Sequence, residues 1–454
     1  MSEKELQSAI QSDLDHIIHP LHHPSTHQAP RIWVKGEGSM ITDIEGNQFI
    51  DGLAGLWNVN VGHGRKELAQ AGAQQMETLA YASGYSGASN LNVIRLAERL
   101  SDLAYPSINA FFFTSGGAEA TDSAIKTARF FWKAKGKPEK FKVISRYLGY
   151  HGVTIGAMNA TGMPGYADAF NCEIPGFLKI PGPYPLFFNK DFQPSERSPT
   201  PGIAAANLLE DAILKEGADT VAAFIAEPVQ GAGGVIVPQE DYFPRIREIC
   251  DQYEVLLIAD EVITGFGRTG KWFALEHWGI EPDIMDFAKG VTSGYLPLGG
   301  IGVSDDIKGV LDGVEPGHRW MHAFTYSGHP TTTAVALANL DYFETHDLVT
   351  RAAETGAHLQ AGLHSLQANH PKVAEARGIG MMGALEILED PATLTKFSKE
   401  ANIGQKLHLE TTARGLWSRT REHVYVMSPP LTTTRDEVDR IVNILDDSLT
   451  AIDC

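Results

Sequence analysis

The sequence predicts an α/β protein with a mostly parallel central sheet and a second, smaller α+β domain. Three observations lead to this fold class. From about residue 110, short apolar runs end in small or polar residues and are followed by helical patterns, as in βαβ units. The runs lack polar alternation, which indicates strands buried on both faces. At 454 residues, the chain is long enough for two large structural units.

Composition argues against nucleic-acid and membrane partners. The chain carries 37 basic and 56 acidic side chains, and its net charge of −19 would repel phosphate backbones and anionic lipids. No stretch reaches the roughly 20 apolar residues of a membrane span, and the N-terminus has no apolar signal core. Cys172, Cys250 and Cys454 are too widely spaced for a disulfide framework or a zinc site. These features predict a cytoplasmic protein.

Near the N-terminus the chain is rich in histidine, the commonest metal-ligating side chain. The histidines are His16, His19, His22, His23 and His27. A metal site would need a further ligand, and no nearby carboxylate or cysteine completes a convincing set. We therefore expect a polar, proline-interrupted surface segment and no bound metal.

Five apolar runs are the predicted strands of the large domain. They occupy residues 110–117, 141–152, 221–229, 255–262 and 283–290. Parallel sheets of this kind bind ligands beyond the carboxyl ends of their strands. The sequence therefore predicts one crevice that is lined by Gly117, Tyr150, Glu227, Asp260 and Lys289.

Two later segments complete the predicted organisation. Residues 182–201 are rich in proline and aromatic residues, which favours an ordered surface loop. After about residue 326 the pattern changes to a long helix over 331–345 and short strands near 383–388 and 424–427. This change predicts the beginning of the smaller domain.

Lys289 and Asp260 stand at the ends of two successive predicted strands, where a buried charge needs a partner or a function. Pyridoxal 5'-phosphate (PLP) would use both. It needs a lysine to form a Schiff base and a carboxylate to keep its pyridine nitrogen protonated. From these two residues alone, a structural ion pair is an equally good interpretation.

Two further motifs are consistent with a phosphorylated, planar cofactor. Residues 114–118 (TSGGA) end a strand and open a helix, whose first backbone N–H groups suit a phosphate. Tyr150 and His151 follow another strand, and the tyrosine ring could stack on a cofactor. Each motif also has an ordinary explanation, because glycines turn chains and aromatic rings fill cores.

The segment GFGRTG at residues 265–270 matches a dinucleotide-binding fingerprint letter by letter. We reject this function, because the glycines begin several residues after the strand ends. The residues that follow, KWF, are a poor start for the helix that should receive a pyrophosphate.

Taken together, three motifs resemble the class III aminotransferases. They are ADEVITGFGRTG at 259–270, PDIMDFAKGVTSGYLPLGG at 282–300 and FTYSGHP at 324–330. The resemblance runs from about Trp33 to beyond Pro430 and is greatest to the ω-transaminases. It implies the type I fold of PLP-dependent transferases, with a large domain at 59–325. The small domain would combine residues 1–58 with 326–454.

The resemblance also implies roles for individual residues at the cofactor. Lys289 would hold PLP as a Schiff base and Asp260 would pair with its pyridine nitrogen. Tyr150 and Val262 would pack on opposite faces of the ring. Glu227 would order Asp260 or a neighbouring arginine through hydrogen bonds.

The phosphate would be held by Gly116, Gly117 and Ala118, with His151 nearby and Thr325 reaching in from the neighbouring subunit of a homodimer. Many relatives carry serines at the positions of Gly116 and Ala118, so the cofactor would be retained less tightly here. Whether the dimers pair into tetramers is left open.

In the substrate pocket, the resemblance implies that Trp57 and Tyr85 form two aromatic walls. Arg419 stands ten residues before Pro429, the family's spacing for an arginine that pairs with substrate carboxylates. Arg421 is the alternative.

The implied activity is that of a PLP-dependent aminotransferase. An amine or ω-amino acid would give its amino group to the cofactor, forming pyridoxamine phosphate, and pyruvate would then accept it in a ping-pong cycle. Alternatives are a 2-oxoglutarate-dependent aminotransferase, an aminomutase, or a PLP-binding module without turnover.

Overall fold

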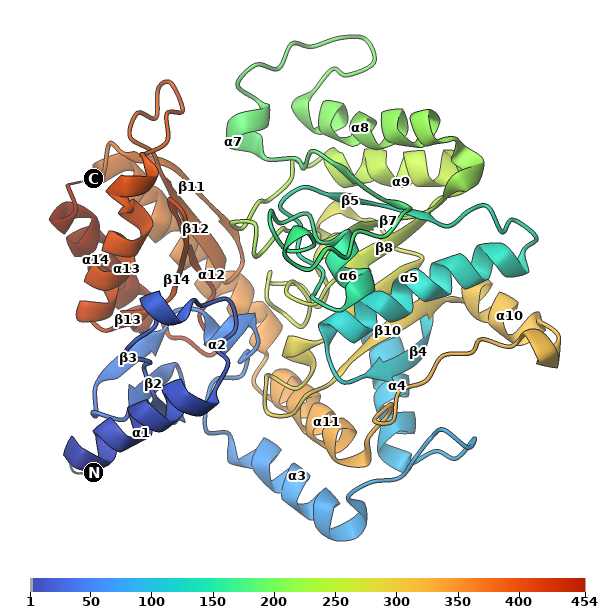
Figure 1. Ribbon diagram of the computed structural model, residues 1–454, viewed down its shortest axis with the longest axis horizontal. Helices are drawn as coiled ribbons and strands as arrows, with labels where there is room; N and C mark the ends of the chain where they lie inside the picture. The colour runs from blue at the N-terminus through green and yellow to red at the C-terminus, as the bar shows by residue number, and fades with distance from the viewer. Residues whose placement is uncertain (1–2, 454) are drawn as a thin grey trace.

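The computed structural model describes residues 3–453, which form two units that lie side by side (Figure 1). The larger unit contains a seven-stranded sheet. Its strands, in spatial order, are β4 (Ile108–Thr114), β10 (Gly299–Ser304), β9 (Ile284–Phe287), β8 (Leu256–Asp260), β7 (Val221–Ala226), β5 (Lys142–Arg146) and β6 (Phe177–Ile180).

One strand of this sheet runs against all the others. β10 is antiparallel to both β4 and β9, whereas the remaining neighbours pair in parallel. β4 therefore points the same way as β9, although it does not touch it. All five predicted strands are present and end at the same edge of the sheet, as the crevice requires. β6 and β10 were not predicted.

Helices cover both faces of the large sheet (Figure 1). On one face α5 (Gly117–Ala134) packs through small residues such as Ala120 and Ala124 against the middle of the sheet. On the other face lie α8 (Pro201–Glu216) and α9 (Tyr242–Gln252). Three shorter helices, α6 (Ile155–Ala160), α7 (Pro185–Phe188) and α10 (Asp305–Gly313), complete this unit.

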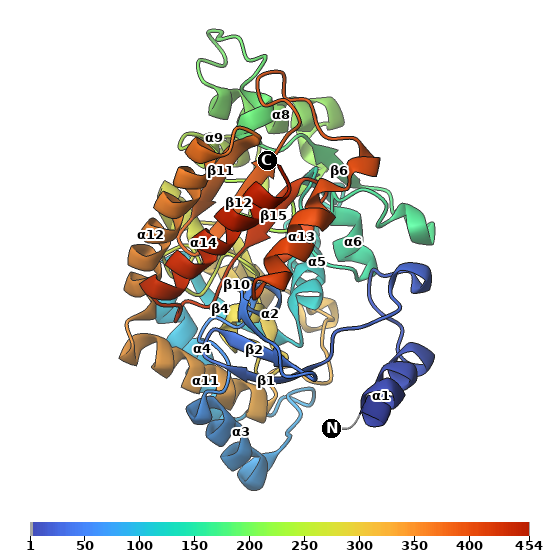
Figure 2. The same cartoon turned by 90° about the vertical axis from the view of Figure 1, so that its left-hand side faces the viewer.

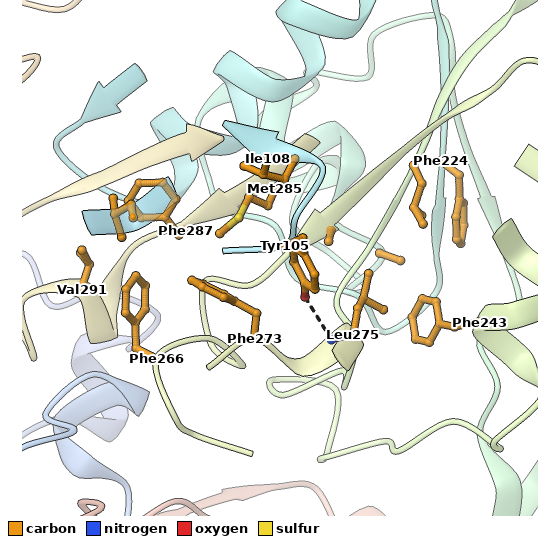
Figure 3. Packing of buried hydrophobic residues seen from close by; sticks show 14 of the residues in the cluster. Tyr105, Ile108, Phe224, Phe243, Phe266, Phe273, Leu275, Met285, Phe287 and Val291 are labelled. Carbon is orange, nitrogen blue, oxygen red and sulfur yellow. Dashed lines mark hydrogen bonds between the residues drawn. The ribbon is translucent and has the colours of Figure 1, made fainter. Parts of the chain in front are cut away.

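An aromatic layer anchors the sheet to the segment that follows β8 (Figure 3). The rings of Phe266 and Phe273 lie 5.3 Å apart, and Phe266 lies 6.1 Å from Phe287 on β9. Tyr105 packs against Phe273, and its hydroxyl accepts a 3.1 Å hydrogen bond from the backbone of Leu275. The GFGRTG segment is therefore held firmly beneath the end of the strand that carries Asp260.

The predicted helix at 331–345 is present as α11 (Pro330–Thr345). It packs against α3 (Lys66–Leu79) and α4 (Leu91–Leu103), and its Leu340 and Phe343 join the core cluster of the large sheet. The domain boundary at 325 stays a prediction, but this helix contributes to the core of the larger unit.

The smaller unit is made from both ends of the chain (Figure 2). One four-stranded sheet has the order β1 (Trp33–Glu37), β2 (Met40–Asp43), β3 (Gln48–Asp51) and β13 (Leu416–Trp417). The other has the order β11 (Val373–Ile379), β12 (Met382–Ile387), β15 (Val424–Met427) and β14 (Arg419–Arg421). β3 and β13 pair in parallel with Ile50 opposite Leu416, and both residues lie in one apolar cluster.

Three long helices cover the second of these sheets, namely α12 (Leu348–Asn369), α13 (Ile403–Ala413) and α14 (Arg435–Ala451). At the other end of the chain, α1 (Glu3–His16) is mostly exposed, and α2 (Ala54–Trp57) is a single irregular turn. Between residues 3 and 453, no helix has both the length and the apolar character needed to cross a bilayer.

Candidate active site

Lys289 lies directly after β9, in a backbone turn that puts it into the left-handed region at φ 45°. A non-glycine residue is rarely held there, and such strain is concentrated at functional sites. Burial lowers the pKa of the Lys289 amine, while the negative charges of Asp260 and Glu227 oppose the shift. This environment favours the neutral, nucleophilic amine.

Asp260 ends β8 as a buried carboxylate with two donors. Its Oδ1 accepts a 3.1 Å hydrogen bond from the backbone of Val262, and its Oδ2 lies 2.7 Å from Nδ1 of His151. The ion pairs of the described residues do not include Asp260 with Lys289, so the structural ion-pair interpretation gains no support. The Nε2 atom of His151 is buried without a hydrogen-bond partner.

Glu227, just after β7, holds the loop that carries Tyr150. Its Oε1 accepts a 2.9 Å hydrogen bond from the backbone of Tyr150, and its Oε2 accepts one of 3.0 Å from Gly231. Burial raises the pKa of Glu227 to about 7. The expected bond to Asp260 is not among its described contacts, and Arg146 binds the backbone carbonyl of Glu227 rather than its carboxylate.

The N-terminus of α5 carries the glycines of the predicted phosphate cradle. A Cβ added at Gly117 would lie 3.0 Å from Cγ1 of Val262, so a larger residue would not fit between this helix and the end of β8. One added at Gly116 would meet no atom within 4 Å, so open space lies in front of the helix. Gly152 lies against the first turn of this helix, because a Cβ added to Gly152 would be 2.6 Å from the Cβ of Ala118.

These residues suit PLP. The first N–H groups of a helix lack intrahelical partners, and the space beside Gly116 is open, so an anion could be held there. A buried carboxylate on the neighbouring strand and a lysine with a lowered pKa supply the other two groups that the cofactor needs. Val262 lies against Gly117, and its role in packing on the ring stays a prediction.

Of the two candidate arginines on β14, only Arg421 has a described hydrogen bond, a long one of 3.4 Å to the carbonyl of Gly233. Arg419 is partly buried, and the described hydrogen bonds and ion pairs give its guanidinium no partner. Burial raises the pKa of the Tyr150 hydroxyl, and the positive charge of Arg419 works against that shift. The charge of Arg419 therefore reaches Tyr150.

The two predicted aromatic walls occupy different settings in this chain. Trp57 is buried and clusters with Val229 and Ile263, which follow Glu227 and Val262 along the chain. Tyr85 is 76% exposed. Thr325 is exposed as well, and its carbonyl accepts a 2.8 Å hydrogen bond from Tyr81. No described contact joins Tyr85 or Thr325 to Lys289.

Two features of the site were not predicted. Asp286 stands beside Asp260 in the register of β8 and β9, is fully buried, and accepts a 2.6 Å hydrogen bond from Thr121 on α5. Arg268 of GFGRTG is also buried. Its guanidinium donates to the carbonyl of Pro429 at 2.5 Å and to the side chain of Asn60 at 2.6 Å. The glycine-rich motif thus ties the two units together.

Comparisons with known proteins agree with this arrangement. The family model described as aminotransferase class-III matches residues 22–449. The putrescine–pyruvate aminotransferase of Pseudomonas aeruginosa is 42% identical, over 91% of this chain and 89% of its own. The diaminobutyrate–2-oxoglutarate transaminase of Halomonas elongata is 41% identical, over 92% of each chain.

Among solved structures, an (S)-enantioselective ω-transaminase from Thermomicrobium roseum superposes with a TM-score of 0.94 at 44% identity, covering 98% of both chains. This likeness extends over both units and confirms the type I fold predicted from the motifs. The chain belongs to the class III aminotransferases, and it is a PLP-dependent enzyme of that family.

Proposed function

We propose that the protein transfers an amino group from an amine or ω-amino acid to pyruvate. The observation that carries this proposal is Arg419, a partly buried cation beside Tyr150 to which the described contacts give no partner. A guanidinium in this setting suits the carboxylate of a 2-oxo acid. The likeness to a putrescine–pyruvate aminotransferase and to an ω-transaminase supports the same substrate pair.

PLP, when bound, supplies a ring that accepts electrons from a breaking Cα–H bond. Lys289 moves the proton between the substrate carbon and the cofactor, since burial favours its neutral amine. Asp260, which is kept in place by Val262 and His151, would pair with the pyridine nitrogen. Glu227 positions Tyr150 by binding its backbone.

The active enzyme is, in this proposal, a homodimer with shared sites. Tyr85 and Thr325 lie in exposed neighbouring segments, whereas the other cofactor residues gather around Lys289. A second copy of the chain would bring these two residues to its partner's crevice. We also place the enzyme in the cytoplasm, which the unpaired Cys172 and Cys250 support.

A complementation experiment tests the shared site. Lys289→Ala and Thr325→Ala chains, each impaired alone, are mixed after mild dissociation. A shared site predicts that mixed dimers regain one intact site out of two, and so recover activity. If light scattering finds only monomers, or if mixing restores nothing, the shared site is wrong.

The acceptor has one serious alternative. The Halomonas relative is named for 2-oxoglutarate and is almost as similar as the pyruvate-dependent one, and Arg419 would suit the carboxylate of either acid. A second carboxylate would need a second cation, for which Arg421 on the same strand is the candidate.

The first experiment follows the absorption band of the bound cofactor. An amine donor should abolish the band, and pyruvate should restore it. Restoration by 2-oxoglutarate alone would refute the acceptor assignment, and the absence of any band would refute cofactor binding. Lys289→Ala should abolish the cycle, whereas Lys271→Ala, at an exposed lysine, is the matched control.

A further inference from the structure

The histidine-rich N-terminal segment plays no part in the transamination site, yet it is folded into a compact cluster. Asp13, His19 and His27 each offer one ligand atom, and these three atoms lie within 4.8 Å of one another. Asp13 is in the last turn of α1, and the chain then turns back so that His27 follows a short 3-10 turn, η1 (Pro24–Thr26). The sequence-based expectation that no carboxylate completes the set was therefore wrong.

The contacts within this cluster are close. Nε2 of His19 lies 2.6 Å from Oδ2 of Asp13, and the rings of His19 and His27 are 4.1 Å apart between centroids. The ring of His22 lies 4.9 Å from that of His27. Three imidazoles packed this tightly around a carboxylate would repel one another if protonated, but they are compatible as neutral ligands.

An independent observation points to a missing partner. Nε2 of His27 is buried and has no hydrogen-bond partner. The ring as a whole is partly exposed, but a polar nitrogen that is shielded from water and has no partner is uncommon. A cation placed among the three ligand atoms would satisfy this nitrogen and would replace the direct contact between His19 and Asp13.

We propose that Asp13, His19 and His27 form a binding site for a divalent cation of the Zn²⁺ class. Two imidazole nitrogens and one carboxylate oxygen are a usual ligand set for such ions, and water or His22 completes the tetrahedron. His22 is oriented by a 2.9 Å contact between its Nδ1 and the carbonyl of Pro20, the kind of outer contact that positions ligating histidines.

The site would act on the N-terminal segment rather than on the reaction. α1 is mostly exposed, so few buried contacts hold it in place. A cation bound by Asp13, His19 and His27 would tie the end of this helix to the segment that leads into β1. The cation should therefore protect residues 1–27 from proteolysis and leave the cofactor site unchanged.

The test uses the untagged holoenzyme, stripped with a chelator and then dialysed against Zn²⁺. We expect one tightly bound zinc per chain by elemental analysis. Asp13→Asn, His19→Ala and His27→Ala should each weaken binding at least about tenfold. His16→Ala is the matched control, since His16 is exposed and outside the cluster. The cofactor absorption band verifies that every variant remains folded.

Two further readouts make the outcome decisive. Co²⁺ in place of Zn²⁺ should give the intense visible spectrum of a tetrahedral site, and Zn²⁺ should slow cleavage of the N-terminal segment by subtilisin, a protease of broad specificity. The proposal is overturned if the wild-type chain binds no stoichiometric zinc. It is equally overturned if the triple variant of Asp13, His19 and His27 binds zinc as tightly as the His16→Ala chain does.

Discussion

Asp260 and Asp286 are neighbouring carboxyl groups in the same register, but their surroundings differ. Asp260 has two donors, from Val262 and His151, which stabilise the anion. Asp286 has one, from Thr121, and burial raises its pKa well above the usual range. Two anions so close together would repel each other. Burial and the charge of Asp260 therefore both favour the protonated form of Asp286.

This difference predicts opposite results for two matched substitutions. Asp286→Asn keeps a neutral side chain of the same shape, so kcat/KM should change by no more than a few fold. Asp260→Asn removes the anion at the pyridine nitrogen and should lower kcat/KM by about 100-fold or more, the scale of a lost charge interaction. Steady-state kinetics on both variants tests this difference. Equal losses of kcat/KM would show that Asp286 is charged too.

The lowered pKa of Lys289 predicts that, in the cofactor-free enzyme, its amine becomes reactive at an unusually low pH. Reagents that attack neutral amines should modify Lys289 at lower pH than the exposed Lys271, as peptide mass spectrometry can follow. Because the charge of Asp260 raises the Lys289 pKa, Asp260→Asn should move this labelling to still lower pH. A shift toward higher pH would contradict the electrostatic account.

At the residue scale, the sequence predicts the site residues that follow the ends of strands. It misses the site residues whose position depends on how neighbouring strands pair. Lys289, Asp260 and Glu227 follow apolar runs and so could be placed at one edge. Asp286 lies within a run, and its role depends on which strand pairs with β9. Asp13 escaped attention because only the turn between α1 and η1 brings it to His19.

Among the elements, β10 is a strand that the sequence pattern does not predict. It reads GGIGVS, and glycine is disfavoured in strands because it has no side chain to pack. The structure gives the reason for these glycines. A Cβ on Gly299 would lie 2.8 Å from the backbone of Gly116, and one on Gly300 would lie 2.6 Å from the carbonyl of Phe112. The glycines that make β10 hard to predict also allow it to pack closely against Gly116, at the start of the predicted phosphate cradle.

The two glycines that open α5 should respond differently to alanine. Gly117→Ala places a methyl group against Val262, so overpacking should lower the stability of the cofactor-free enzyme by about 1–3 kcal/mol. Gly116→Ala meets open space, so that stability should hardly change, but affinity for PLP should fall because the methyl group occupies the place of the phosphate. Thermal unfolding and cofactor titration separate the two effects, and equal losses of stability would refute the open cradle.

For the whole molecule, Arg268 is a buried link between the glycine-rich segment of the large unit and Pro429, which follows the last strand of the small unit. Arg268→Met leaves the carbonyl of Pro429 and the side chain of Asn60 without their donor, at about 1–3 kcal/mol each. For a chain of 454 residues, the unfolding midpoint should fall by about 2–6 °C. Arg351→Met, at an exposed arginine, is the control. An unchanged midpoint would show that the units are held together elsewhere.

The large unit was easier to predict than the small one, because its strands follow each other along the chain. The small unit depends on partners that are hundreds of residues apart, and periodicity carries no information about such pairing. The resemblance to a family supplied that part of the architecture.

The pairing of β3 with β13 also has a consequence for folding during synthesis on the ribosome. Ile50 leaves the ribosome long before its partner Leu416, which is made more than 300 residues later. Until then the edge of β3 is open and prone to wrong pairing. The large unit can fold while synthesis continues, whereas the N-terminal strands must wait. The sheet that contains β3 can therefore be completed only after residue 416 has left the ribosome.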